Sequence, residues 1–192
     1  MGYSISWVAF KGISREAGLS RLLLTETQRT TSLGEAPCSG IALPGGWYLV
    51  VAKGCDSQVI STSFLSRLSA DCEAVSGSVE EHVMYSAAEG WRNGNRDWRI
   101  AHDAQKARRH IECTGEAPDS YGKALDQARA EQDAEDAAED EVDFYFEIPL
   151  QVAKTVVGFK HDEECEGVDY DRFTVIERVG STAGRPWWKF WK

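Results

Sequence analysis

The chain has 192 residues, of which 42% are hydrophobic and 27% charged, and its formal net charge is −10. These values describe an ordinary globular protein that can bury a sizeable core, with a single domain as the default expectation. The acidic balance argues against nucleic acid as a partner, because affinity for phosphate groups depends on Lys and Arg. A basic partner fits this charge better than an acidic one.

The N-terminal segment and the cysteines both indicate a cytoplasmic protein. The first residues lack the basic region, the long apolar stretch and the cleavage site of a secretory signal. No apolar run approaches the roughly 20 residues that a transmembrane helix needs. The five cysteines are odd in number and form no C-x-x-C pair, which favours buried reduced thiols.

The first part of the chain predicts a strand, a helix, a loop and a second strand. Polar and apolar residues alternate over 3–10, which indicates a strand, and Ser14 is a suitable N-cap for a short helix that ends near Leu24. The segment 25–40 is polar and rich in turn formers, so we expect a mobile loop there. The apolar run over 45–53 predicts a strand near the centre of the sheet.

The middle of the chain predicts a helix followed by antiparallel strands. Ser61 or Ser63 can cap a short helix, and one or two strands follow within 72–91. A further antiparallel strand is predicted over 108–115.

A β-hairpin is the most clearly readable motif of the chain. Asn93 and Gly94 form a strong turn dipeptide, and the segment 96–103 returns as the partner strand. Trp91 and Trp98 flank this turn, and we expect the two rings to pair across it.

The last part of the chain predicts two helices and a final strand. After Pro118, the segment 119–140 is rich in Ala, Glu, Gln and Arg, which favours a helix. A second helix is predicted to begin near Pro149 and to end at Gly158, and alternation over 170–179 indicates a strand.

The predicted order of elements indicates an α+β domain with a mostly antiparallel sheet and helices packed on one face. We expect this single domain to span 1–180, followed by a flexible spacer and an aromatic, basic tail over 181–192. The tail contains Trp187, Trp188 and Trp191. Such aromatic groups mark a contact, either with the protein's own surface, which we expect, or with a partner.

An acidic run over 131–143 holds eight acidic residues and no basic residue. Without this run, the chain has 23 acidic and 21 basic residues, so most of the net charge is local. The run is either a solvated segment or a docking surface for a cationic partner. For docking, the candidate residues are Glu135, Asp136, Glu139 and Asp140, and neutralising them is expected to slow association with little change in stability.

Catalytic and metal-binding signals are weak. The segment 161–167 combines one His, one Cys and four carboxylates, but their spacing is poor for a metal site, so we expect a solvated loop and no metal or cofactor. The chain has no P-loop, G-x-S-x-G, G-x-G-x-x-G or H-E-x-x-H motif. A cleft that brings together His82, His102 or Cys55 would still allow a small enzyme.

Three segments resemble parts of uncharacterised bacterial cytosolic proteins: YSISWVAFKG at 3–12, LPGGWYLVV at 43–51, and the hairpin over 79–103. The acidic, single-domain α+β character is also similar to immunity proteins of contact-dependent bacterial toxin systems. This second resemblance implies a non-catalytic protein that binds and inhibits a cationic toxin, and neither resemblance implies a role for any particular residue.

We therefore expect a non-catalytic protein-binding protein, with a small enzyme as the alternative. Its oligomeric state is left open by the sequence. One further alternative is self-association through a basic patch around Lys106, Arg108 and Arg109.

Overall fold

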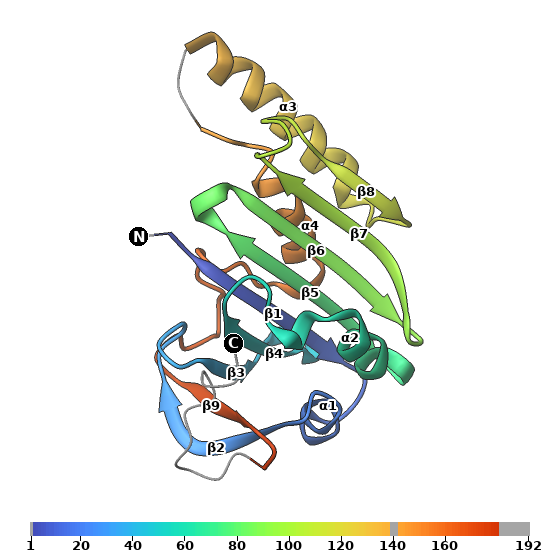
Figure 1. Ribbon diagram of the computed structural model, residues 1–192, viewed down its shortest axis with the longest axis vertical. Coiled ribbons are helices and arrows are strands. Elements are labelled where there is room, and N and C mark those ends of the chain that lie inside the picture. Colours follow the sequence, from blue (N-terminus) through green and yellow to red (C-terminus); the bar gives the residue numbers. More distant parts are fainter. Residues whose placement is uncertain (1, 139–141, 181–192) are drawn as a thin grey trace, which may run out of the picture.

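The computed structural model describes residues 2–138 and 142–180. Within these residues, one sheet of nine strands has the order β2-β9-β3-β4-β1-β5-β6-β7-β8, and its strand pairings are antiparallel (Figure 1). The α+β class and the antiparallel sheet are thus confirmed. In the same described residues, no helix is both long and apolar enough to cross a membrane.

The bounds of the elements are as follows. The strands are β1 (Ser4–Lys11), β2 (Leu24–Thr31), β3 (Cys38–Ala42), β4 (Tyr48–Lys53), β5 (Glu73–Glu80), β6 (Tyr85–Arg92), β7 (Asn95–Asp103), β8 (Glu112–Gly115) and β9 (Phe173–Arg178). The α-helices are α1 (Arg15–Arg21), α2 (Thr62–Leu68), α3 (Ser120–Ala138) and α4 (Glu147–Val157).

The helices pack on both faces of the sheet, not on one face as the sequence predicted. Strand β1 explains this arrangement, because consecutive residues of a strand point to opposite faces and β1 is apolar on both. Trp7 lies in the cluster that also contains residues of α4, whereas Val8 and Phe10 lie in the cluster with residues of α1 and α2. A strand that is apolar on both sides needs cover on both sides, and β1 and β4 are indeed central in the sheet.

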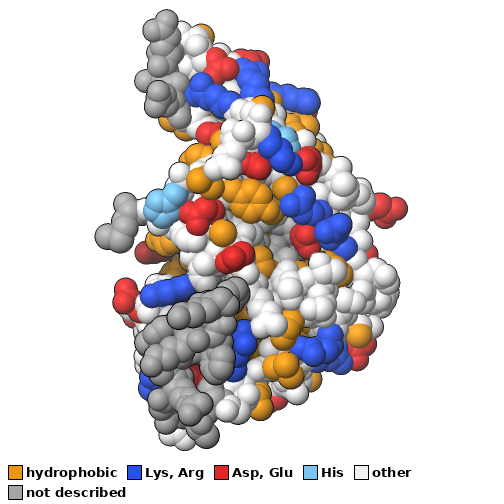
Figure 2. Space-filling view, viewed as in Figure 1, with side chains coloured by type: hydrophobic (Ala, Val, Ile, Leu, Met, Phe, Trp, Pro, Cys, Tyr) orange, Lys and Arg blue, Asp and Glu red, His pale blue; other side chains and the backbone are white. Residues whose placement is uncertain are grey.

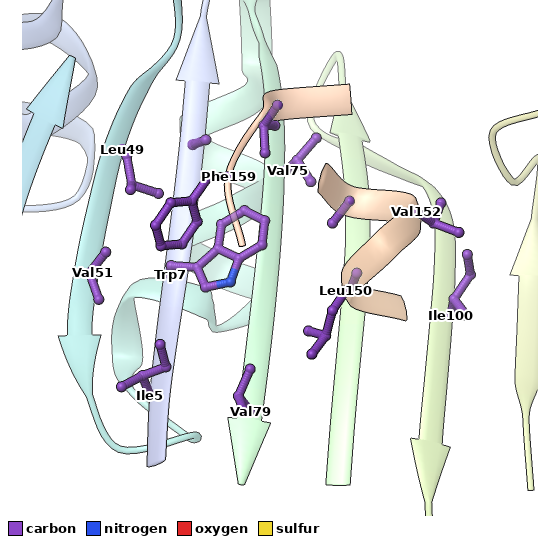
Figure 3. Close-up of a cluster of buried hydrophobic side chains, with 14 of the residues drawn as sticks. Ile5, Trp7, Leu49, Val51, Val75, Val79, Ile100, Leu150, Val152 and Phe159 are labelled. Carbon is purple, nitrogen blue, oxygen red and sulfur yellow. The ribbon is translucent and has the colours of Figure 1, made fainter. Parts of the chain in front are cut away.

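The larger core lies between the sheet and α4. Figure 3 shows Leu150 and Val152 of α4 beside side chains from the central strands. The Trp7 ring meets the edge of Phe159, with 5.6 Å between ring centroids, directly after α4 ends. Helix α4 ends where predicted, because Gly158 adopts the left-handed conformation (φ 81°) that terminates a helix.

The prediction of a mobile loop over 25–40 is wrong, because most of this segment forms strands β2 and β3. β2 is an edge strand and has only one paired side, so a polar, Thr-rich sequence suffices for it. Its partner β9 comes almost 150 residues later in the chain, and the register includes Leu24 opposite Arg178. A pairing of this kind leaves no local signal in the sequence.

The predicted pairing of Trp91 with Trp98 is also wrong. The Asn93–Gly94 turn joins β6 and β7 as expected, but the register shifts between Gly90 and Trp91. This bulge places Trp98 opposite Gly90, and the two tryptophans point to opposite faces of the sheet.

Candidate binding surface

One half of a sheet face carries no helix. Figure 1 shows α1 and α2 in front of the lower part of the sheet, while the fronts of β6, β7 and β8 are uncovered. The cross-strand register places five polar or aromatic residues on this uncovered area, which we call the open face: Tyr85, Glu89, Arg96, Arg99 and Glu112. Figure 2 shows hydrophobic and charged side chains side by side on this part of the molecule.

Glu89 is the centre of the open face. Its Oε2 accepts a hydrogen bond from the Trp91 indole N–H at 2.9 Å, and its Oε1 accepts one from Arg96 Nη1 at 3.0 Å. The same Oε1 lies 3.3 Å from Arg99 Nε. One carboxylate therefore orients an indole and two guanidinium groups, and such charge-assisted contacts hold flexible side chains in place.

The network continues from Arg99 to the edge of the sheet. Arg99 Nη2 lies 3.5 Å from the Tyr85 hydroxyl, and Nη1 lies 3.7 Å from Glu112 Oε2. Glu112 in turn accepts hydrogen bonds from Lys106 Nζ (2.8 Å) and His110 Nε2 (3.1 Å). These two donors lower the pKa of Glu112 to about 2, so its carboxylate stays ionised even in mildly acidic solution.

The acidic run contacts basic residues of the same chain. Asp136 lies 3.1 Å from Arg108 Nη1 and accepts a hydrogen bond from Arg109 Nη2 at 2.6 Å, and Asp133 lies 2.6 Å from Arg109 Nη1. Hydrogen bonding to Arg109 is the main reason why the pKa of Asp136 is lowered. The basic patch proposed for self-association is thus engaged with the end of α3, while Lys106 pairs with Glu112.

The remaining candidates of the acidic run have different positions. Glu135 Oε1 accepts a hydrogen bond from the Val142 N–H at 3.2 Å. The neighbouring Gln132 is fully buried and bonds to the backbone of the same connection, at Val142 O. Glu139 and Asp140 lie outside the described residues, as do Trp187, Trp188 and Trp191 of the tail.

These ion pairs change the expected effect of neutralising Asp136. We expect Asp136→Asn to lower the melting temperature by a few degrees, because it weakens the contacts that hold the loop at Arg108 and Arg109 against α3. Circular dichroism melts will measure the shift. Asp126→Asn is the matched control on the same helix, since Asp126 has a side chain that is 80% exposed. Equal melting temperatures for both variants would show that the pairs at Asp136 make no net contribution.

Of the residues proposed for an enzymatic cleft, His82 and Cys55 share a neighbour, whereas His102 has different partners. His82 and Cys55 both neighbour Glu80: His82 Nδ1 lies 2.6 Å from its Oε1, while Glu80 contributes to the pKa shift of Cys55. Burial, followed by the charges of Glu80 and Asp56, raises the pKa of the Cys55 thiol, whereas a nucleophilic cysteine needs a lowered pKa.

His102 has its own, separate environment. Its ring is fully buried, and Nδ1–H donates to the His110 carbonyl oxygen at 2.7 Å. Nε2 lies 2.9 Å from Asp143 Oδ2, although the atoms are not aligned for a hydrogen bond. Asp143 Oδ1 accepts from two backbone N–H groups at the start of α4, so this cluster fastens the α3–α4 connection to the sheet.

Most of the segment 161–167 is the solvated loop that the sequence predicted, but its first residue, His161, is buried. His161 is buried and lies 3.1 Å from Glu81 Oε1, and the preceding Lys160 is buried as well. In the described part of the chain, no group of three His, Cys, Asp or Glu side chains is arranged to hold a metal ion.

The sequence by itself does not reveal the open face. The only local signal is the spacing of Tyr85 and Glu89, which places both on one side of a strand. The partner residues on β7 could not be assigned, because the bulge after Gly90 changes the register. No protein-family model, no curated protein and no solved structure matches the chain.

Proposed function

We propose that the protein is a non-catalytic binding protein that contacts a basic protein partner through the open face. The observation that carries the proposal is the ordered network in which Glu89 holds Arg96 and Arg99, and Arg99 reaches Tyr85, on an area without a covering helix. Tyr, Trp and Arg provide most of the binding energy in protein interfaces, and side chains that are ordered before binding lose less entropy.

The charge distribution supports a basic partner. Residues 89–143, which include most of the open face and all of α3, contain fifteen acidic and eight basic residues, so this region has a net charge of −7. Figure 1 shows β8 and α3 at the same end of the molecule. Negative charge around a contact area attracts a cationic protein at long range and raises the association rate, while the contacts of the open face determine affinity.

The most specific form of the proposal is an immunity-type inhibitor that covers the active site of a cationic bacterial toxin. This form combines the acidic half of the molecule with an ordered contact area that no helix covers. Co-expression of the wild-type chain should rescue cells that produce a basic toxin neutralised by this protein.

Affinity capture from the native host tests the proposal. We expect wild-type protein to retain a basic protein that high salt releases, and we expect Tyr85→Ala and Arg99→Ala each to reduce its retention roughly tenfold or more, which corresponds to about 1.4 kcal/mol. Arg172→Ala is the control, because this arginine is exposed next to β9, at the other end of the strand order. Quantitative mass spectrometry of the eluates gives the ratio.

Two results would overturn the proposal. One is a captured partner that is acidic, and the other is a partner whose retention is the same for Tyr85→Ala, Arg99→Ala and the Arg172→Ala control. Thermal melts of all three variants should accompany the experiment, so that lost binding is not confused with lost folding.

A further inference from the structure

The two edges of the sheet differ in how they are protected. At β2, the register with β9 is interrupted between Glu26 and Thr30, and the Thr27 hydroxyl donates to Val175 O at 3.0 Å. At the other edge, β8 pairs with β7 in an uninterrupted register, and all four of its residues are exposed. Irregular edge strands resist pairing with another chain, whereas a regular, exposed edge permits it.

The hydrogen bonds of β8 can be assigned from its end. Glu116 N–H donates to Asp97 O at 2.9 Å, and bonded pairs in an antiparallel ladder recur at every second residue. Arg99 therefore bonds with Thr114, and the intervening Cys113 directs its N–H and C=O away from β7. Among the described residues, no backbone group outside the sheet bonds to Cys113 on this side.

We propose that β8 accepts an extended cationic segment of the partner as a tenth strand, continuous with the open face. This inference rests on the proposed function and specifies the kind of contact that the partner makes. Side chains of an added strand would alternate between two environments. On the open face they would lie next to the carboxylate of Glu112, which is 48% exposed beside Lys106 and Arg99 and can accept a further Lys or Arg. On the opposite face they would lie next to Cys113, beside Tyr121 of α3, which favours an apolar residue.

The probe for this inference is a blocked peptide of about eight residues in which Lys and Val alternate, a length typical of one strand. We expect the peptide to shift the amide resonance of Cys113 in the ¹⁵N-labelled full chain and to slow its hydrogen exchange. A second peptide with Glu in place of Lys should bind roughly tenfold more weakly or worse, because of Glu112 and the acidic surroundings.

One substitution separates the backbone edge from the side chain. Cys113→Pro removes the outward N–H without breaking a bond to β7, since proline is compatible with an outward-facing edge position. We expect this variant to lose at least about tenfold in affinity for the Lys–Val peptide, while Cys113→Ala keeps wild-type affinity. A Lys–Val peptide that is N-methylated on alternate residues should also fail to bind. If Cys113→Pro does not fold, the comparison of this peptide with the unmodified one tests strand addition on the wild-type chain.

Equal binding of the N-methylated and unmodified peptides, or shifts that leave Cys113 unaffected, would overturn strand addition. This result is distinct from failure of the proposed function. If a partner is captured in an Arg99-dependent way but the peptide does not protect Cys113, only strand addition is excluded. If the peptide protects Cys113 but no basic partner is captured from the host, only the proposed function is excluded.

Discussion

Gly77→Val is expected to lower the free energy of unfolding by about 3 kcal/mol, the upper part of the range for overpacked cores. Gly77 lies directly opposite Trp7 on the neighbouring strand, and a Cβ atom at this position would come within 2.3 Å of the indole. The ring cannot move aside easily, because Trp7 is 1% exposed and packs against Phe159. Urea denaturation followed by tryptophan fluorescence will measure the change.

Two further variants test this explanation. Gly122→Ala is the control, since Gly122 lies in α3 with no atom within 4 Å of an added Cβ, and we expect it to stabilise the protein by up to about 1 kcal/mol. Combining Gly77→Val with Trp7→Val should cost less than the two single changes added together, because the smaller side chain removes the clash. Strict additivity of the two changes would contradict the proposed contact.

Lys160→Met is expected to destabilise the protein by about 3 kcal/mol, as is typical when one partner of a buried ion pair is removed. The Lys160 side chain is only 5% exposed, and its Nζ lies 3.0 Å from Glu147, 2.7 Å from Asp162 and 3.3 Å from Glu163. Burial by itself lowers the pKa of Lys160, but hydrogen bonding to Asp162 and the charge of Glu147 outweigh burial and raise it. Without the ammonium group, three carboxylates face one another.

The effect of Lys160→Met should depend on pH. Hydrogen bonding to Lys154 is the main reason why the pKa of Glu163 is lowered to about 2, against an ordinary value of about 4.5. A lowered carboxyl pKa stabilises the fold above pH 4.5, and this contribution is lost as the pH falls towards 2. The raised pKa of Lys160 stabilises the fold at neutral and acidic pH, and this contribution is lost only as the pH rises into strongly alkaline solution.

Urea titrations at neutral pH and near pH 3 will measure this dependence. We expect the difference between wild type and Lys160→Met to shrink near pH 3, because the contribution of the ionised carboxylates to wild-type stability falls below pH 4.5. Lys160→Arg retains the charge and should cost clearly less at neutral pH. A difference that is the same at both pH values would show that packing of the lysine stem, not charge, accounts for the loss.

Local sequence patterns by themselves determined several elements of this protein. The Asn93–Gly94 turn and the end of α4 at Gly158 depend on residues that adopt left-handed backbone conformations, so a few adjacent residues suffice to predict them. The central position of β4 likewise followed from its continuous apolar run. Near-neighbour contacts specify the turn and the helix end, whereas the apolar run of β4 needs cover on both faces, which a central strand receives.

Only the tertiary structure decided where the open face and the buried charges lie. Strand β2 exists because β9 pairs with it, Lys160 is buried because Glu147 and Asp162 compensate its charge, and Arg99 reaches Glu89 only through the bulged register of β7. The β2–β9 pairing joins residues almost 150 positions apart, and the Lys160–Glu147 and Arg99–Glu89 contacts depend on how a helix and a bulged strand are placed. Local propensity carries no information about such pairs, because their free energy arises only when the sheet has assembled.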